Sequence, residues 1–326
     1  MNYPPNTLSL VADIGGTNTR CALAKGHEVL PNTVRRYSNV EHSGLETVLR
    51  QYLVDMGDVD PAAACVAVAG PVRDGVATMT NLDWAIDRDT LARATKAETV
   101  AILNDLQAQG YALSDLNEAS LRPVISSSAE AQNADATKLV VGVGTGFNSS
   151  PVFETAGARF VPPAEAGHAN LPIRTEQELR LCQYVSTAHG FPAVEDVLSG
   201  RGLERVYGFM GQEHGTPKSG RAQDIMSACA EGTDPLAKEA VALFCRILGT
   251  VCGNLALIQL PFGGVYLVGG VARAMAPYLT EFGFADAFRD KGRFAGFMGN
   301  FSVSVVEDDY AALIGSASHL GALRHV

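Results

Sequence analysis

Two glycine-rich segments, each directly after an apolar run, are the first candidates for chemistry. The first is DIGGTNTR (Asp13–Arg20), which follows the apolar run Thr7–Ala12. Adjacent glycines let the backbone approach a ligand closely, and turned N–H groups can hold phosphate oxygens. The carboxylate of Asp13 could in addition hold a hydrated Mg²⁺ ion. The spacing matches neither the Walker nor the Rossmann fingerprint, so the ordinary alternative is a tight hairpin turn.

The second glycine-rich segment repeats this design. GVGTGFNSS (Gly142–Ser150) overlaps the end of the apolar run Leu139–Val143, and another apolar strand follows it. One such hairpin is weak evidence for a ligand site. Two of them at matching positions of two lobes could hold a phosphate chain from both sides, so coincidence becomes a poorer explanation.

A carboxylate and an amide close a third apolar run. Asn104 and Asp105 stand where the strand Thr99–Leu103 ends. In open α/β sheets ligands collect beyond the carboxyl ends of the strands. A carboxylate there could accept the proton of a substrate hydroxyl that attacks phosphorus. The alternative is a helix N-cap, because Asp favours that position and Leu106–Leu113 has a helical pattern.

Three further polar residues have the chemistry of a sugar site. Glu165 and His168 lie in PPAEAGHANLP, which shows no helical pattern and predicts a loop, and Glu195 lies in VEDVLSGRGL. Carboxylates and imidazoles can form hydrogen bonds with the vicinal hydroxyls of a sugar. For any one of them alone, an ordinary solvated surface residue is the simpler interpretation.

The elements that must position these residues are alternating strands and helices. Apolar positions on a single face predict a helix over 45–56, and a longer apolar face predicts a helix over Pro235–Leu260. A final helix is expected from about Tyr310. The remaining strands are predicted at Cys21–Ala24, Thr33–Tyr37, Ala63–Ala69, Gly264–Val268 (before GGVA, Gly269–Ala272) and Ser302–Val306. The recurrence of strand, glycine turn and strand indicates an internal duplication and two α/β lobes facing each other across a cleft.

Composition excludes several classes of protein. The 326 residues carry a formal charge of −10, which disfavours a nucleic-acid binder. No apolar run approaches the ~20 residues that span a bilayer, so we expect no membrane partner. The N-terminus MNYPPNTLSL has no basic flank or long apolar stretch, and we expect a cytoplasmic protein. The six scattered cysteines are then expected to be reduced and mostly buried.

Taken in order, the motifs resemble those of the bacterial glucokinase family. They are DIGGTNTR, LND, GVGTG, EAGH, EDVLSGRGL and LVGGVA, and the resemblance runs from Asp13 to the tail DDYAALIGSASHL. It implies a two-lobed ribonuclease-H-like (actin-type) α/β fold with the active site in the interlobe cleft. The lobes would be a small domain of residues 1–111 plus about 303–326 and a large domain of residues 112–302. The implied reaction transfers the γ-phosphoryl group of ATP, with Mg²⁺, to the 6-hydroxyl of glucose.

The resemblance also implies a role for each candidate residue, and a homodimer. Asp105 would be the general base. The sugar hydroxyls would be bound by Asn104, Glu165, His168 and Glu195. ATP would be held by Asp13 (through a metal-bound water), Gly15, Gly16, Thr17, Asn18, Gly144, Thr145, Gly146, Gly269 and Gly270, the last two near the adenosine.

Two residues depart from the family's pattern. Asn148 stands where relatives tend to have the last glycine of GTGLG, and Ala166 replaces the first glycine of EGGH. Asn tolerates left-handed backbone better than most residues, which leaves the geometry at position 148 open. The cysteine-rich zinc motif of the repressor–kinase sugar family is missing, which argues against that relative.

Three alternatives remain beside a glucokinase. A kinase for another hexose or amino sugar would have the same polyhydroxylated site. A sugar-sensing regulator is disfavoured by the acidic chain and by the lack of a helix-turn-helix before the first strand. A non-enzymatic actin-like ATPase module would leave Glu165, His168 and Glu195 without a role.

Overall fold

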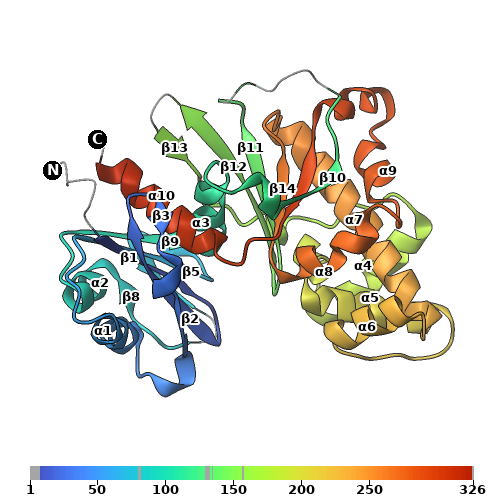
Figure 1. Cartoon of the computed structure of the whole chain (residues 1–326). Helices are drawn as coiled ribbons and strands as arrows, with labels where there is room; N and C mark the ends of the chain where they lie inside the picture. The colour runs from blue at the N-terminus through green and yellow to red at the C-terminus, as the bar shows by residue number, and fades with distance from the viewer. Residues whose placement is uncertain (1–7, 80–81, 129–132, 134, 156–157, 325–326) are drawn as a thin grey trace. The chain divides into compact units, whose positions relative to one another are not determined.

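The computed structural model describes residues 8–79, 82–128, 133, 135–155 and 158–324. They form two compact units, each with its own sheet and core (Figure 1). The first unit comprises Met1–Glu118, Glu154–Pro163 and Asp308–Val326, and the second comprises Ala119–Phe153 and Ala164–Glu307. The domain boundaries predicted from the sequence stay a prediction, because compactness alone does not define a domain.

A mixed sheet forms the centre of the first unit. Its strands are β1 (Leu8–Ile14), β2 (Asn18–Lys25), β3 (Glu28–Val29), β4 (Arg35–Ser38), β5 (Ala63–Val68) and β9 (Thr99–Asn104). The order is β3-β2-β1-β5-β9, and β4 also pairs with β2. The β1–β2 pair is antiparallel, whereas β1–β5 and β5–β9 are parallel. Because β5 is buried along its whole length, its sequence is a continuous apolar run rather than an alternating one.

Predicted and observed strands differ at the start of β2, which begins at Asn18 and not at the predicted Cys21, and around Pro31. The predicted strand Thr33–Tyr37 begins two residues too early, since Pro31–Thr33 is a 3-10 turn and β4 starts at Arg35. Proline's fixed φ suits the first position of such a turn, and Thr33 Oγ1 stabilises it by donating to Leu30 O at 2.6 Å. The predicted start of the first strand, Thr7, lies outside the described residues.

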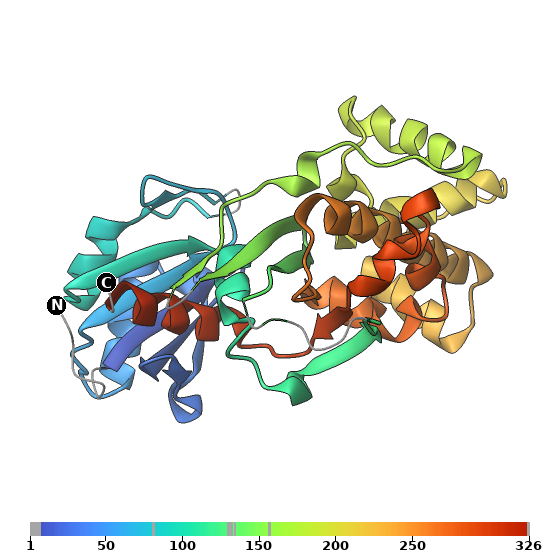
Figure 2. The ribbon, with the colours of Figure 1, turned by 90° about the horizontal axis from the view of Figure 1, so that it is seen from above.

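Helices cover both faces of this sheet. They are α1 (Leu45–Asp55), α2 (Arg88–Thr95), α3 (Asp105–Ala112) and α10 (Ala311–Arg324). The helix predicted over 45–56 is confirmed, with Leu45, Val48, Leu49 and Tyr52 buried. Helix α10 lies against β1, β5 and α3, as Figures 1 and 2 show. A separate small sheet contains β6 (Val72–Arg73), β7 (Val76–Ala77) and β8 (Ile86–Asp87).

The second unit repeats the strand pairing of the first. Its sheet contains β10 (Leu121–Ile125), β11 (Lys138–Val143), β12 (Phe147–Thr155), β14 (Val265–Val268) and β15 (Val303–Val306). The order is β10-β15-β14-β11-β12. The β11–β12 pair is antiparallel, and β11–β14 and β14–β15 are parallel, as in β1, β2, β5 and β9. The recurrence predicted from the sequence is therefore present in the strand pairing. The short strand β13 (Ala158–Phe160) belongs to the first unit.

The helices of the second unit surround one long central helix. They are α4 (Glu176–His189), α5 (Gly200–Glu213), α6 (Ala222–Glu231), α7 (Pro235–Gln259), α8 (Gly270–Leu279) and α9 (Phe284–Arg289). Helix α7 matches the prediction to one residue. Asp234 Oδ1 caps it by accepting from Leu236 N at 2.9 Å, and Pro235 occupies its first position.

Helix α7 corrects one expectation from the sequence. By length and composition it is apolar enough to cross a membrane, although we expected no run of that length. Within the structure 67% of its apolar window is buried, and its residues belong to the core of the second unit. Burial in a protein core requires the same composition as burial in lipid, so this helix is weak evidence for a membrane span.

All six cysteines are buried and free, as predicted. Burial raises the pKa of Cys65 and of Cys252 to about 12. Their thiols therefore stay protonated at neutral pH and pack as apolar groups.

Candidate active site

The first glycine turn is shorter than the motif that predicted it. Asp13 and Ile14 belong to β1. Asn18, the last predicted ATP ligand of this segment, already belongs to β2. The turn proper is Gly15–Thr17, closed by a bond from Gly15 N to Asn18 O at 3.0 Å. Gly16 and Thr17 are exposed, so their backbone and hydroxyl groups are accessible to a ligand.

Asn39 holds this turn, and the sequence analysis missed it. Its side chain is buried, with Nδ2 donating to Gly15 O at 2.8 Å and Oδ1 accepting from Thr19 Oγ1 at 2.8 Å. Its backbone N donates to Thr17 O at 2.9 Å. The surrounding sequence, YSNVEHS, carries no signal that would have identified it.

Asp13 lies near the end of β1 beside a cation. Arg20 Nη1 is 3.9 Å from Asp13 Oδ2, and the Asp13 side chain is 25% exposed. Burial raises the pKa of Asp13, and the charge of Arg20 partly opposes that rise. Within the described ranges, no group of three His, Cys, Asp or Glu residues could hold a metal ion directly. The single carboxylate of Asp13 fits an Mg²⁺ ion whose other ligands are waters and nucleotide phosphates.

Asp105 lies at the same edge of the sheet as the first glycine turn. The parallel register aligns Ile14 of β1 with Val68 of β5, and Val68 with Asn104 of β9. Adjacent strands lie about 4.8 Å apart, so the ends of β1 and β9 are about 10 Å apart. The first unit therefore brings the predicted base and the predicted phosphate turn to one edge.

Asn104, and not Asp105, caps helix α3. Asn104 Oδ1 accepts from Leu106 N at 3.0 Å, and Asn104 N donates to Gln107 Oε1 at 3.2 Å, which completes a capping box. Asn104 Nδ2 donates to Gly70 O at 2.9 Å. Asp105 is the first helical residue, and its Oδ1 accepts from Leu106 N at 2.8 Å. The N-cap role that the sequence offered as an alternative for Asp105 is therefore taken by Asn104.

The second glycine turn is held by Glu195. Gly144 N donates to Gly146 O at 2.9 Å, which closes the turn between β11 and β12, with Thr145 exposed at its tip. Phe147 N donates to Glu195 Oε2 at 2.9 Å. A Cβ on Gly146 would stand 2.5 Å from Glu195 Oε2, so only glycine allows the carboxylate to come this close. A predicted sugar ligand and a predicted phosphate turn are therefore in direct contact.

The loop that carries Glu165 and His168 packs on the same turn. Ala166–His168 forms a short 3-10 helix, where the sequence predicted an irregular loop. His168 Nε2 lies 3.9 Å from Glu165 Oε2, and both side chains are more than half exposed. A Cβ on Gly167 would overlap Phe147 O, so the loop lies directly on the start of β12.

A cavity of about 350 Å³ opens at His168 and Glu195. Its lining residues are His168, Phe191, Ala193, Glu195, Asp196, Ser199, Arg201 and Arg205. Arg205 Nη1 pairs with Asp196 Oδ1 at 3.0 Å, so one of the two arginine charges in the cavity lining is balanced. The volume and the mixture of one aromatic with several polar side chains suit a small polar ligand. The second unit thus brings together three of the four predicted sugar ligands, since Glu165 adjoins His168.

The GGVA turn lies against the second glycine turn. Gly269 caps helix α8 with a φ of 104°, a conformation that favours glycine. A Cβ there would also stand 2.5 Å from Val143 O, the carbonyl just before Gly144. Gly270 is the first residue of α8. The predicted adenosine and phosphate segments are therefore neighbours within this unit.

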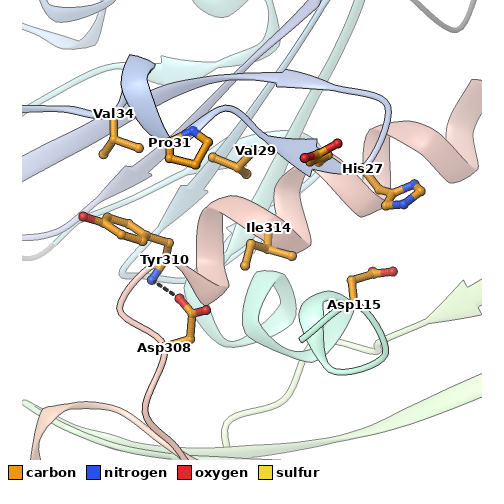
Figure 3. Close-up of a pocket in the computed structure, with 9 residues that line it drawn as sticks. His27, Val29, Pro31, Val34, Asp115, Asp308, Tyr310 and Ile314 are labelled. Atoms are coloured by element: carbon orange, nitrogen blue, oxygen red, sulfur yellow. Dashed lines mark hydrogen bonds between the residues drawn. The ribbon is translucent and has the colours of Figure 1, made fainter. Parts of the chain in front are cut away.

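A second cavity lies in the first unit and has different chemistry (Figure 3). It has a volume of about 360 Å³ and is lined by His27, Glu28, Val29, Pro31, Val34, Asp115, Asp308, Tyr310 and Ile314. Three of these side chains are carboxylates, and in the described part of the chain its lining includes no lysine or arginine. Tyr310 N donates to Asp308 Oδ1 at 2.7 Å. This acidic lining is unsuited to phosphate, and none of the predicted site residues contributes to it.

Comparison with known proteins assigns this fold to the sugar kinases. A glucokinase solved from an Antarctic psychrotroph is similar with a TM-score of 0.85 at 29% identity, covering 96% of this chain and 98% of that one. The fold is also that of a glucokinase from Balamuthia mandrillaris, solved in complex with glucose, with a TM-score of 0.80 at 22% identity over 95% of this chain and 92% of that one.

The family model described as Glucokinase matches residues 10–322, and the chain belongs to the glucokinase family. A curated glucokinase of Saccharophagus degradans is 34% identical over 319 residues, which cover 96% of this chain and 98% of the relative. The resemblance inferred from the ordered motifs is confirmed, and so are glucokinase function and the class of ATP-dependent hexose kinases. The sensor and the ATPase-module alternatives are therefore set aside.

Proposed function

We propose that this chain phosphorylates glucose at its 6-hydroxyl with Mg²⁺-ATP, and that the residues described above carry out the reaction. One observation supports the assignment most strongly. The Glu195 carboxylate accepts from Phe147 N at the end of the second glycine turn, and the same side chain lines the cavity that contains His168. A phosphate-binding turn and a sugar-binding cavity that share a wall are what phosphoryl transfer to a sugar requires.

Asp105 is the proposed general base. It is half-buried at the N-terminal end of α3, where a negative charge is stabilised. Because Asn104 does the capping, the Asp105 carboxylate is not required for that task. In the reaction the glucose O6 forms a bond to the γ-phosphorus, the bond from phosphorus to the ADP oxygen breaks, and the O6 proton passes to Asp105.

Asn104, Glu165, His168 and Glu195 are the proposed ligands of the sugar hydroxyls. Asn104 already uses Nδ2 for Gly70 O and Oδ1 for Leu106 N. An amide has two N–H donors and two oxygen lone pairs, so each end retains capacity for one further bond. Glu195 accepts from Phe147 N through Oε2, and its Oε1 is the proposed acceptor for a sugar hydroxyl in the cavity that this residue lines.

The phosphates of ATP are assigned to the two glycine turns, with Asp13, Gly15, Gly16, Thr17 and Asn18 in the first. Gly144, Thr145 and Gly146 form the second, and Gly269 and Gly270 adjoin the adenosine. When bound, Mg²⁺ would neutralise charge on the transferred phosphoryl group. Asp13 would hold that ion through a coordinated water, in agreement with its partly buried carboxylate.

Three finer assignments belong to this proposal: the type of fold, the oligomeric state and the location. The ribonuclease-H-like (actin-type) description is supported by the matching strand pairing of the two sheets. The homodimer is implied by the resemblance to the family, and the cytoplasmic location stays the expectation stated from the sequence.

The choice of sugar is tested by measuring ADP release with Mg²⁺-ATP against glucose, fructose, mannose, galactose and N-acetylmannosamine. We expect glucose to give the highest kcat/KM, and chelation of Mg²⁺ to abolish turnover. A higher kcat/KM for another sugar would contradict the glucose assignment and would favour the alternative of a different hexose or amino sugar kinase.

A further inference from the structure

One side chain, Asn148, ties the loop that carries Glu165 and His168 to the second glycine turn. Asn148 is the second residue of β12 and is half-buried. Its Nδ2 donates to Ala164 O, and its Oδ1 accepts from Ala166 N at 2.9 Å. The same oxygen also accepts from Ser149 N at 2.8 Å.

These bonds account for an asparagine at this position. Asn148 is not among the described residues with a positive φ, so left-handed backbone is not the reason for it. The glycine that relatives tend to have here could make neither bond to the loop. The side chain, rather than the backbone, is therefore what this position contributes.

The two bonds flank Glu165. Ala164 O precedes it and Ala166 N follows it, so Asn148 fixes the chain on both sides of that carboxylate. Ala166 also opens the 3-10 turn that ends at His168, and its N-cap residue, Glu165, makes no capping bond through its side chain. The first N–H groups of such a turn need partners from outside it, and Asn148 supplies one.

We propose that Asn148 is a positioning residue for the glucose loop of this kinase. It acts through Glu165 and His168, and so rests on the proposed function of those residues. Together with Phe147 N, which binds Glu195, it makes the first two residues of β12 the common support of three sugar ligands. Substrate binding would then depend on a side chain that does not touch the sugar.

Steady-state kinetics of Asn148→Ala test this proposal. We expect the KM for glucose to rise about tenfold, because two hydrogen bonds that order the loop are lost. The KM for ATP and kcat should stay within about threefold of the parent. The matched control is Asn300→Ala, since Asn300 is also half-buried in the second unit and its Nδ2 donates to Phe297 O at 2.8 Å.

Amide hydrogen exchange of residues 164–168 gives a second readout that is independent of catalysis. Asn148→Ala should accelerate exchange at Ala166, and Asn148→Asp, which keeps an oxygen for Ala166 N, should restore part of the protection. A glucose KM within twofold of the parent in Asn148→Ala would overturn the proposal, as would an equal rise in Asn300→Ala.

The variant Glu165→Gln separates this proposal from the proposed function. A normal glucose KM in Glu165→Gln contradicts the sugar role of that residue. A raised KM in Glu165→Gln together with a normal KM in Asn148→Ala contradicts only the positioning role of Asn148.

Discussion

At the scale of single residues, Glu195 serves two neighbouring segments with one carboxylate. It accepts from Phe147 N beside the second glycine turn and lines the cavity that contains His168. A substitution at the second glycine turn should therefore alter the cavity, and a substitution in the cavity should alter the turn. Gly146 is the position at which that dependence is most open to test, because its missing Cβ leaves room for the carboxylate.

We predict that Gly146→Ala displaces Glu195 and weakens glucose binding. The new Cβ would stand 2.5 Å from Glu195 Oε2, and the end of a flexible side chain moves more readily than backbone. Loss of the bond to Phe147 N should lower the free energy of unfolding by about 1–2 kcal/mol. The glucose KM should rise about tenfold, because the displaced carboxylate loses its contact with the sugar and about 1–2 kcal/mol of binding free energy is lost with it.

Gly144→Ala is the matched control for this variant. A Cβ on Gly144 meets nothing within 4 Å, and its φ is not positive. Its free energy of unfolding should change by less than about 0.5 kcal/mol, and its glucose KM should stay that of the parent. Equal effects of the two substitutions, in denaturation and in kinetics, would contradict the role given to Glu195.

The sequence could predict the ligands more readily than their supports. Asp105, Glu165 and Glu195 stand in ordered motifs, whereas the partners of Asn39 and Asn148 lie 24 and 18 residues away in the chain. Such bonds depend on how distant segments meet, which local pattern does not contain. One support was readable: Asn104 followed three residues later by Gln107 is a capping box.

At the scale of elements, the position of α3 depends on its close approach to α10. A Cβ on Gly315 would overlap Ala108 O, so the two helices touch through a glycine. Helix α3 begins with Asp105, and the proposed base is therefore positioned from the far end of the chain. Residues 105 and 315 are linked through the packing of α3 on α10.

We predict that Gly315→Ala destabilises the protein and lowers kcat. The new Cβ would overlap the backbone oxygen of Ala108, which moves less easily than the end of a side chain. The free energy of unfolding should therefore fall by about 3 kcal/mol. Gly321→Ala in the same helix is the control, since a Cβ there meets nothing within 4 Å. It should raise the free energy of unfolding by about 0.5–1 kcal/mol. Urea denaturation checks both, and a Gly315→Ala variant as stable as the parent would refute the packing argument.

The elements that could be predicted are those with a long pattern. The continuous apolar run of β5 and the 3.6-residue period of α1 and α7 predicted their bounds to within a residue. The strands β6, β7 and β8 have two residues each, too few for any period. The shift of β4 arises from a local bond of Thr33, which hydrophobic pattern does not record.

At the scale of the whole molecule, stability should depend on pH through His319. Burial lowers the pKa of His319 to about 4, and its ring centroid lies 4.6 Å from that of Tyr111. In the unfolded chain the imidazole titrates near its ordinary pKa of 6.5. Between these values the unfolded state binds the proton and the folded state does not, so stability falls as pH drops from about 6.5 to 4.

We predict that His319→Phe reduces this loss of stability. Phenylalanine keeps an aromatic ring against Tyr111 and removes the titration, which contributes on the order of 3 kcal/mol across the whole window. Urea denaturation of the parent and the variant at pH 7, 6, 5 and 4 measures the two slopes. A variant with the slope of the parent would contradict a neutral, half-buried His319.

The recurrence of strand, glycine turn and strand predicted the antiparallel pair β1–β2 in one sheet and β11–β12 in the other. It did not predict that Glu154–Pro163 belongs to the first unit, because no change of composition marks that segment. Tertiary contacts decide which compact unit a segment belongs to. A segment of ten residues can join either unit without a distinctive composition.

The most direct test of the account measures glucose 6-phosphate formation and glucose binding in parallel for the wild type and Asp105→Asn. Asparagine keeps an oxygen for Leu106 N, so helix α3 should remain in place. We predict that kcat falls by about 10²–10⁴-fold, because the proton of the 6-hydroxyl loses its acceptor, while the Kd for glucose from calorimetry changes by less than about threefold. Turnover within tenfold of the wild type, or loss of glucose binding in the variant, would contradict the role of Asp105 as the general base.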